Sequence, residues 1–113
     1  MHELSIARAL IDAAARRAEG RRVVALSVSV GALRQVVPAT LSFNFAIAST
    51  GTPCAGAHLE LLAVPVRLRC PCWAEWELQP GELAFRCPRC GSPDAVVLSG
   101  EELSLDSIEV QED

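Results

Sequence analysis

The chain has 113 residues, of which 50% are hydrophobic and 21% are charged, and its formal net charge is −4 at pH 7. This length allows one small domain, or one domain with an insertion. The negative charge argues against general nucleic-acid binding, which needs a basic surface, and no apolar run is long enough for a membrane helix. The N-terminus lacks the basic start and apolar core of a secretory signal, so we expect a cytoplasmic protein.

The first part of the chain predicts a helix followed by a strand. Residues 4–19 repeat apolar side chains at helical spacing, and Gly20 directly after them favours a helix end. Residues 23–30 then alternate, with valine or leucine at every second position from Val24 to Val30. This alternation is typical of a half-buried strand.

A second helix is predicted to begin at Pro38, because proline suits the first turn of a helix. Residues 50–53 contain the glycine and proline that end it. Its apolar residues form an inner stripe with two large side chains beside it, namely Leu41, Phe45 and Ala48 in the stripe and Phe43 and Ile47 beside it.

Two further strands are predicted at residues 57–66 and 102–110, where apolar and polar residues again alternate. The apolar positions of the last strand change phase half-way along it. A bulge resets the face of a strand by one residue, so we expect a bulge near Asp106 and Ser107.

The order of elements predicts an α+β fold. We expect a small α/β domain, with two helices on a three-stranded sheet, formed by residues 1–66 and 98–113. Residues 67–97 hold four of the five cysteines and predict an inserted zinc-binding domain that resembles a zinc ribbon.

The first three residues, Met1, His2 and Glu3, form a candidate metal chelator. The free α-amine, the backbone nitrogen of His2 and its imidazole can bind one ion in a plane, which is the geometry that Ni(II) and Cu(II) favour. Glu3 can add a carboxylate oxygen or its backbone nitrogen. Histidine at position 2 also occurs by chance, so this short motif alone has a high false-positive rate.

The cysteines form two close pairs, Cys70 with Cys72 and Cys87 with Cys90. Four thiolates at such spacing favour a closed tetrahedral zinc site. We expect the segment between the pairs to form a hairpin around Pro80-Gly81, and metal binding to supply its folding free energy. A redox dithiol and an iron site of the rubredoxin type are the alternatives for these thiols.

Other polar residues carry weaker signals. Cys54 is unpaired in the sequence and is expected to be a semi-buried structural thiol. His58 is expected on the exposed face of a strand, with nickel binding as the less favoured role. Arginines surround the cysteine pairs and either balance the thiolate charge or face an acidic partner, namely Arg67, Arg69, Arg86 and Arg89.

Four motifs occur together over nearly the whole chain. They are Met1-His2-Glu3, G-x-L-x-x-V-V-P at residues 31–38, C-P-x-C-G-S at residues 87–92 and G-x-E-L-x-L-x-x-I-E-V at residues 100–110. In this combination the chain closely resembles the HypA/HybF family of hydrogenase maturation factors. It departs from the family where C-x-x-C-G is replaced by Cys70-Pro71-Cys72-Trp73, and where Ala32 and Val37-Pro38 stand in place of acidic residues.

The resemblance implies a nickel metallochaperone. Such proteins help to insert Ni(II) into the large subunit of NiFe hydrogenase with a partner GTPase of the HypB type, and some also work with urease accessory proteins. It assigns transient nickel to Met1, His2 and Glu3, and structural zinc to Cys70, Cys72, Cys87 and Cys90. We expect a monomer or a weak homodimer, with no nucleic-acid or membrane partner.

Two other classes of function agree less well with the sequence. A zinc-ribbon module that binds protein or nucleic acid would need only the cysteines, and would leave Met1 and His2 without a role. An enzyme is not expected, because the sequence has no nucleophile–base pair, phosphate loop or paired acids, and a four-thiolate zinc ion has no open position for catalysis.

Overall fold

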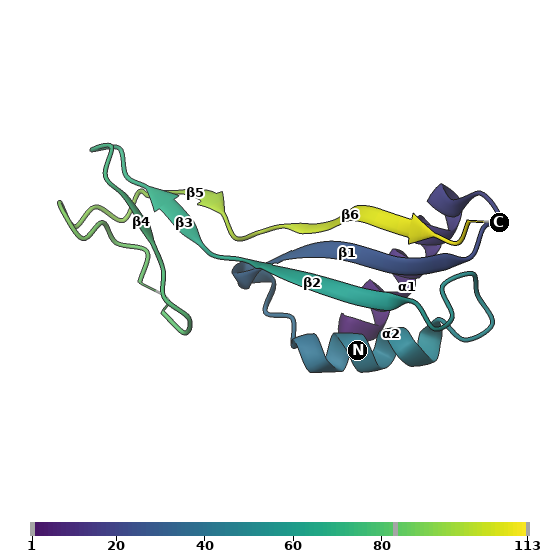
Figure 1. The fold of residues 1–113 in the computed structure, drawn as a ribbon. Helices are drawn as coiled ribbons and strands as arrows, with labels where there is room; N and C mark the ends of the chain where they lie inside the picture. The colour runs from purple at the N-terminus through teal and green to yellow at the C-terminus, as the bar shows by residue number, and fades with distance from the viewer. Residues whose placement is uncertain (1, 83, 113) are drawn as a thin grey trace. The chain divides into compact units, whose positions relative to one another are not determined.

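The structure of the chain is a computed structural model that describes residues 2–82 and 84–112 (Figure 1). Its elements in chain order are α1 (His2–Ala18), β1 (Val23–Gly31), the short 3-10 helix η1 (Ala32–Arg34), α2 (Pro38–Ala48), β2 (His58–Val64), β3 (Arg67–Arg69), β4 (Glu75–Glu77), β5 (Val96–Ser99) and β6 (Leu103–Val110).

The chain divides into two compact units. One unit, called the helical unit here, comprises Met1–Ser29, Val36–Leu62 and Ser104–Asp113. The other, called the cysteine unit, comprises Val30–Gln35 and Ala63–Leu103. The second unit is therefore formed mainly by an insertion before the last strand, and the predicted α+β fold is confirmed.

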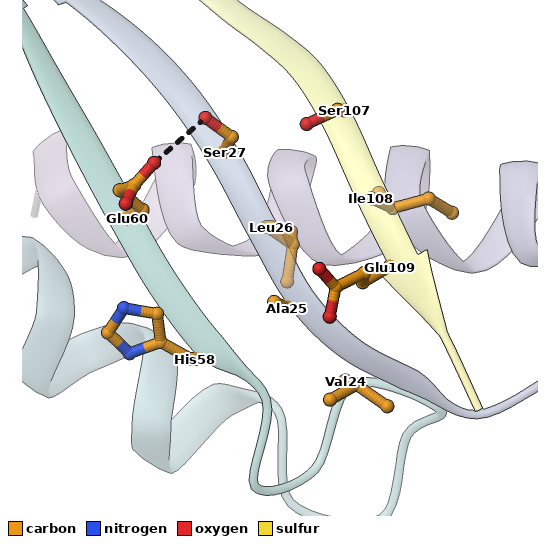
Figure 2. A pocket seen from close by; sticks show the side chains of 9 residues that line it. All are labelled: Val24, Ala25, Leu26, Ser27, His58, Glu60, Ser107, Ile108 and Glu109. Carbon is orange, nitrogen blue, oxygen red and sulfur yellow. Dashed lines mark hydrogen bonds between the residues drawn. The ribbon is translucent and has the colours of Figure 1, made fainter.

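The helical unit holds both α-helices, which pack against each other. The strands form a three-stranded sheet of order β2-β1-β6, and both helices lie behind it in the view of Figure 2. Its core consists of apolar residues from both helices, from β1 and from the loop after α2, namely Ile6, Ala7, Leu10, Ile11, Ala14, Ala18, Val23, Leu26, Val28, Leu41, Phe45 and Cys54.

The prediction for the buried face of β1 is wrong at Val24, the first residue expected on that face. Val24 is 43% exposed, whereas Val23 is 1% exposed and Leu26 is also buried. Two residues separate Val23 from Leu26, so the buried face changes phase at the start of the strand. The backbone N–H of Val23 donates to the carbonyl of Pro53 at 2.9 Å, which fixes this end of β1 to the loop after α2.

The predicted strand at residues 57–66 ends early. It stops at Val64, and a separate strand begins at Arg67, because Pro65 has no N–H to donate to a sheet. In β6, Asp106 and Ser107 are both exposed between partly buried neighbours, which is the change of phase that the sequence predicts.

The cysteine unit contains an antiparallel sheet of order β4-β3-β5. Leu68 of β3 lies opposite Trp76 of β4 and Val97 of β5. Its small core consists of Val66, Leu68 and Leu78, with partly buried side chains around it, namely Leu33, Trp76, Ala95 and Val97.

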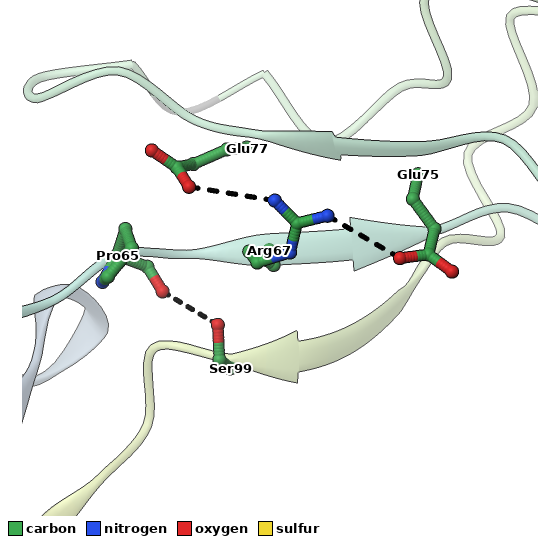
Figure 3. A network of polar contacts seen from close by, with 5 residues as sticks. All are labelled: Pro65, Arg67, Glu75, Glu77 and Ser99. Atoms are coloured by element: carbon green, nitrogen blue, oxygen red, sulfur yellow. Dashed lines mark hydrogen bonds and ion pairs between the residues drawn. The ribbon is translucent and has the colours of Figure 1, made fainter.

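The hairpin predicted around Pro80-Gly81 is wrong. A turn does form there, with the N–H of Glu82 donating to the carbonyl of Gln79 at 2.9 Å, but no strand occurs among described residues 84–95. Instead β4 pairs with β3 across the first cysteine turn. Arg67 joins this hairpin through exposed ion pairs with Glu75 at 3.5 Å and Glu77 at 3.6 Å (Figure 3), which contribute little to stability.

The glycines that open two of the sequence motifs meet in the cysteine unit. The N–H of Leu33 donates to the carbonyl of Gly100 at 2.8 Å, and the N–H of Gly31 donates to the carbonyl of Glu102 at 2.7 Å. A Cβ on Gly31 would lie 2.1 Å from the Gly100 carbonyl oxygen. Gly100 has a φ of +115°, and a Cβ there would lie 2.9 Å from the Cα of Val66. Each position therefore requires glycine.

Candidate metal centres

The four cysteines predicted as zinc ligands come together in the cysteine unit. Their Sγ atoms all lie within 4.8 Å of one another. Those of Cys70 and Cys90 are 3.4 Å apart, and those of Cys72 and Cys87 are 3.7 Å apart. Four sulfurs at zinc–thiolate distance around one ion stand about 3.8 Å apart at the corners of a tetrahedron, so the cluster has nearly the size that such an ion requires.

The second cysteine turn points backbone N–H groups at sulfur. The N–H groups of Arg89 and Cys90 lie 3.3 Å and 3.4 Å from the Sγ of Cys87. The N–H of Gly91 donates to the carbonyl of Cys87 at 2.9 Å, and Gly91 has a φ of +75°. Glycine adopts this left-handed conformation without steric cost.

The first cysteine turn is also closed by backbone hydrogen bonds, although its two cysteines are separated by one residue fewer. The N–H of Cys70 donates to the carbonyl of Ala74 at 2.9 Å, and the N–H of Trp73 donates to the carbonyl of Cys70 at 2.8 Å. Trp73 follows the second cysteine of its pair as Gly91 does, and it is also left-handed, with a φ of +73°. A large side chain in this conformation is strained. Its indole is 75% exposed, and the guanidinium of Arg69 lies 5.2 Å from the ring centroid.

The turns also set the protonation of the thiols. The N–H of Cys72 favours the Cys70 thiolate, but burial and the neighbouring thiols outweigh it and raise the pKa of Cys70 to about 12. Burial opposes the thiolate of Cys87 as well, yet the N–H groups of Cys90 and Arg89, with the thiols of Cys70 and Cys72, lower its pKa to about 6. Cys87 is therefore a thiolate at neutral pH and supplies a ligand that is ready for a cation.

The N-terminal site lies in the helical unit, and Met1 is outside the described residues. His2 is exposed and is the first residue of α1. Backbone N–H groups in the first turn of a helix have no partner within the helix. The backbone nitrogen of His2 can therefore bind a metal without breaking a helical hydrogen bond.

Glu3 makes a contact that the sequence does not predict. Its Oε2 accepts a hydrogen bond of 3.2 Å from the backbone N–H of Val37, the residue that caps the start of α2. This bond, a second one from its own backbone N–H and the nearby positive charges lower the pKa of Glu3. Glu3 is thus an ionised carboxylate that ties the start of α1 to the start of α2.

Cys54 and His58 stand apart from both centres. Cys54 is fully buried, more deeply than predicted, and its thiol lies 3.9 Å from the carbonyl oxygen of Ile11. His58 is exposed on β2 as predicted, beside a hollow in the sheet that is also lined by Glu60 and Glu109 (Figure 2). Neither His2 nor Glu3 lines this hollow.

Residues 1–110 match the family model described as hydrogenase/urease nickel incorporation, metallochaperone. This chain belongs to the HypA family. A HypA hydrogenase maturation factor of Chloroflexus aurantiacus is 47% identical over 114 residues, covering 96% of this chain and 98% of the relative. The corresponding protein of Deinococcus radiodurans is 44% identical over 108 residues, covering 93% and 89%.

A solution structure of the nickel metallochaperone HypA from Helicobacter pylori has the same fold. It superimposes with a TM-score of 0.67 at 22% identity, and the match covers 100% of both chains. The family model and the two relatives confirm the family resemblance inferred from the four motifs. The HypA family consists of metallochaperones that serve hydrogenase and urease, and not of catalytic enzymes. Among described residues 2–82 and 84–112, no helix combines the length and apolar character needed to cross a membrane.

Proposed function

We propose that this chain binds Ni(II) through Met1, His2 and Glu3, and that it delivers the ion to the large subunit of NiFe hydrogenase. A HypB-type GTPase would assist, urease maturation would be a second client, and the work would take place in the cytoplasm. The observation that carries the proposal is the exposed His2 at the first position of α1 in a chain that matches the nickel metallochaperone family from residue 1.

The proposed nickel ligands are the α-amine, the backbone nitrogen of His2 and its imidazole. Three nitrogens in a plane satisfy the tetragonal preference of Ni(II) and leave one position for Glu3, water or a partner residue. Since one carboxylate oxygen of Glu3 accepts the Val37 N–H, the other oxygen is the one better placed to bind an ion. So small a ligand set suits an ion that must be released.

We further propose that Cys70, Cys72, Cys87 and Cys90 hold structural zinc. The close fit of their sulfurs to a tetrahedron and the N–H groups directed at Cys87 support a closed thiolate site. In this proposal residues 67–97 form the zinc domain, and residues 1–66 with 98–113 form the nickel domain. Zinc would stabilise the fold, and nickel would be the cargo.

The test of the nickel site compares the untagged chain, with its native free amine, with a copy whose α-amine is acetylated. Calorimetry should show nickel binding by the first and none by the second, because an acetylated amine is uncharged and cannot act as a metal ligand. The zinc content should stay the same in both. Nickel affinity should also fall as the pH drops, since amine and imidazole must lose their protons to bind.

His2→Ala provides the matched side-chain test. It should abolish nickel binding and leave the helical circular dichroism and the zinc content unchanged, because His2 is exposed. Equal nickel affinity in the native and acetylated chains, or retained affinity in His2→Ala, would show that nickel binds elsewhere.

A further inference from the structure

The region between η1 and β2 carries no charged side chain. Residues 36–57 contain no Asp, Glu, Lys, Arg or His, although 21% of the whole chain is charged. This region includes all of α2. A helix on a protein surface normally presents charged and polar residues to water on its outer side, so the composition of α2 is unusual for a solvated helix.

Two large apolar side chains project from α2 into solvent. Leu41 and Phe45 are buried against the helical unit, whereas Phe43 is 66% exposed and Ile47 is 58% exposed. Phe43 and Ile47 are four residues apart and therefore neighbours on one side of the helix. With the exposed Thr40, they form what is called here the outer face of α2. An exposed, uncharged apolar face of this kind marks an interaction site.

The outer face begins beside the N-terminal residues. Val37, which caps α2, donates its N–H to the carboxylate of Glu3 at 3.2 Å and is itself 53% exposed. The helices α1 and α2 also pack on each other within the helical unit. A protein that rests on the start of α2 would therefore have the first residues of the chain within reach.

We propose that the outer face of α2 is the docking surface for the protein that exchanges nickel with the N-terminal site, and that this protein presents an apolar, uncharged patch to it. The proposal rests on the proposed function, because a partner must bring its own ligands to the ion while His2 still holds it. A charged patch does not fit this face, since its charge would lose water and find no opposite charge across the interface.

The size of the face favours a brief encounter over permanent pairing. An eleven-residue helix is about 16 Å long, and only Phe43 and Ile47 project from its outer face as large apolar side chains. A stable dimer buries about 800 Å² on each partner, which is more than one side of this helix can provide. A second copy of the chain is therefore a poorer occupant than a partner that binds, takes or gives the ion, and leaves.

The test is a double variant, Phe43→Gln with Ile47→Gln, which keeps helix propensity and removes the apolar side chains. The matched control is Val96→Thr with Leu98→Thr on β5 of the cysteine unit, where the two side chains are 53% and 41% exposed. The nickel-loaded chains are titrated with the purified HypB-type GTPase and with the purified apo large subunit of NiFe hydrogenase, both from the same organism.

We expect the double variant to bind at least one of these two proteins about tenfold more weakly, and to exchange nickel with it correspondingly more slowly. The control should match the unchanged chain. Because the face is uncharged, the affinity lost in the double variant should be nearly the same at low and high salt. Unaltered binding to both proteins, or an unchanged chain that binds neither, would overturn the proposal.

Nickel affinity of the isolated variants separates this proposal from the proposed function. If neither the unchanged chain nor the double variant binds nickel, but the double variant alone loses partner binding, the nickel function fails and the docking surface stands. If the unchanged chain and the double variant bind nickel equally and bind both partners equally, the docking surface is wrong and the nickel function is unaffected. Sedimentation that shows a dimer of the unchanged chain and a monomer of the double variant would assign the face to a second copy and overturn the proposal.

Discussion

At the scale of single residues, two glycines explain why their motifs have the form they do. Gly31 lies in extended backbone, with a φ of −74°, so its conformation does not call for glycine. What calls for it is the Gly100 carbonyl oxygen, 2.1 Å from where a Cβ would lie. Gly100 combines a close approach to Val66 with a left-handed φ. The second and fourth motifs are thus the two sides of one backbone contact.

Gly31→Ala should therefore destabilise the cysteine unit by at least about 3 kcal/mol, because the methyl group meets backbone that cannot rotate away. Gly81→Ala is the matched control in the same unit, since Gly81 has a φ of +87° but nothing within 4 Å of its would-be Cβ. It should cost about 1 kcal/mol, the price of a left-handed alanine. Urea unfolding followed by tryptophan fluorescence measures both. Equal losses of stability in the two variants would show that the backbone around Gly31 shifts to make room for the methyl group.

The sequence identifies the residues of both candidate centres but not how they are supported. Cysteine spacing is local, so the four thiols can be predicted to share one ion, and the structure brings them together. The hydrogen bond from the Val37 N–H to the Glu3 carboxylate joins residues far apart in the chain, and no sequence pattern in either segment predicts it. The full burial of Cys54 depends in the same way on distant residues of α1.

At the scale of elements, the two cysteine turns solve one geometric problem with different residues. Each needs a left-handed residue directly after its second cysteine. Gly91 supplies it without strain in the longer turn, and Trp73 supplies it in the shorter one. The contact with Arg69 offsets part of the cost of holding the indole there.

Substitution of Trp73 should expose this strain. Trp73→Gly should leave the stability of the cysteine unit within about 1 kcal/mol of its original value, because strain relief offsets the loss of the Arg69 contact. Trp73→Val should destabilise it by about 1–3 kcal/mol, since a β-branched residue tolerates a positive φ poorly. Thermal unfolding followed by Trp76 fluorescence distinguishes the two. If valine is tolerated as well as glycine, the turn is not strained at Trp73.

Helices and long strands were predictable because their apolar periodicity is local. The helix α1 was expected at residues 4–19 and spans His2–Ala18, and α2 begins at Pro38 as expected. The hairpin of the cysteine unit was placed at the wrong turn. Pro80-Gly81 is a strong turn signal, but the strand pairing is decided by the turn at Cys70–Ala74, whose backbone hydrogen bonds close the β3–β4 hairpin.

At the scale of the whole molecule, the two units differ in what stabilises them. The helical unit buries apolar side chains from both helices and the sheet. Among the described residues of the cysteine unit, the hydrophobic core has three buried aliphatic side chains, those of Val66, Leu68 and Leu78. So small a core does not offset the entropy of ordering the chain, and small units of this kind usually need a metal or disulfides. All five cysteines are free thiols in the structure, so the proposed zinc would supply this support.

Removal of the proposed zinc should consequently unfold the cysteine unit and leave the helical unit folded. Both tryptophans of the chain, Trp73 and Trp76, lie in the cysteine unit, whereas α1 and α2 lie in the helical unit. A strong chelator should shift tryptophan emission to longer wavelength while most of the helical circular dichroism persists, and added zinc should reverse the shift. Trp73 is already exposed, so the shift should come from Trp76 and should survive in Trp73→Phe. Loss of the helical signal in step with the fluorescence would mean that the two units fold as one, and that the proposed zinc site stabilises the nickel site as well.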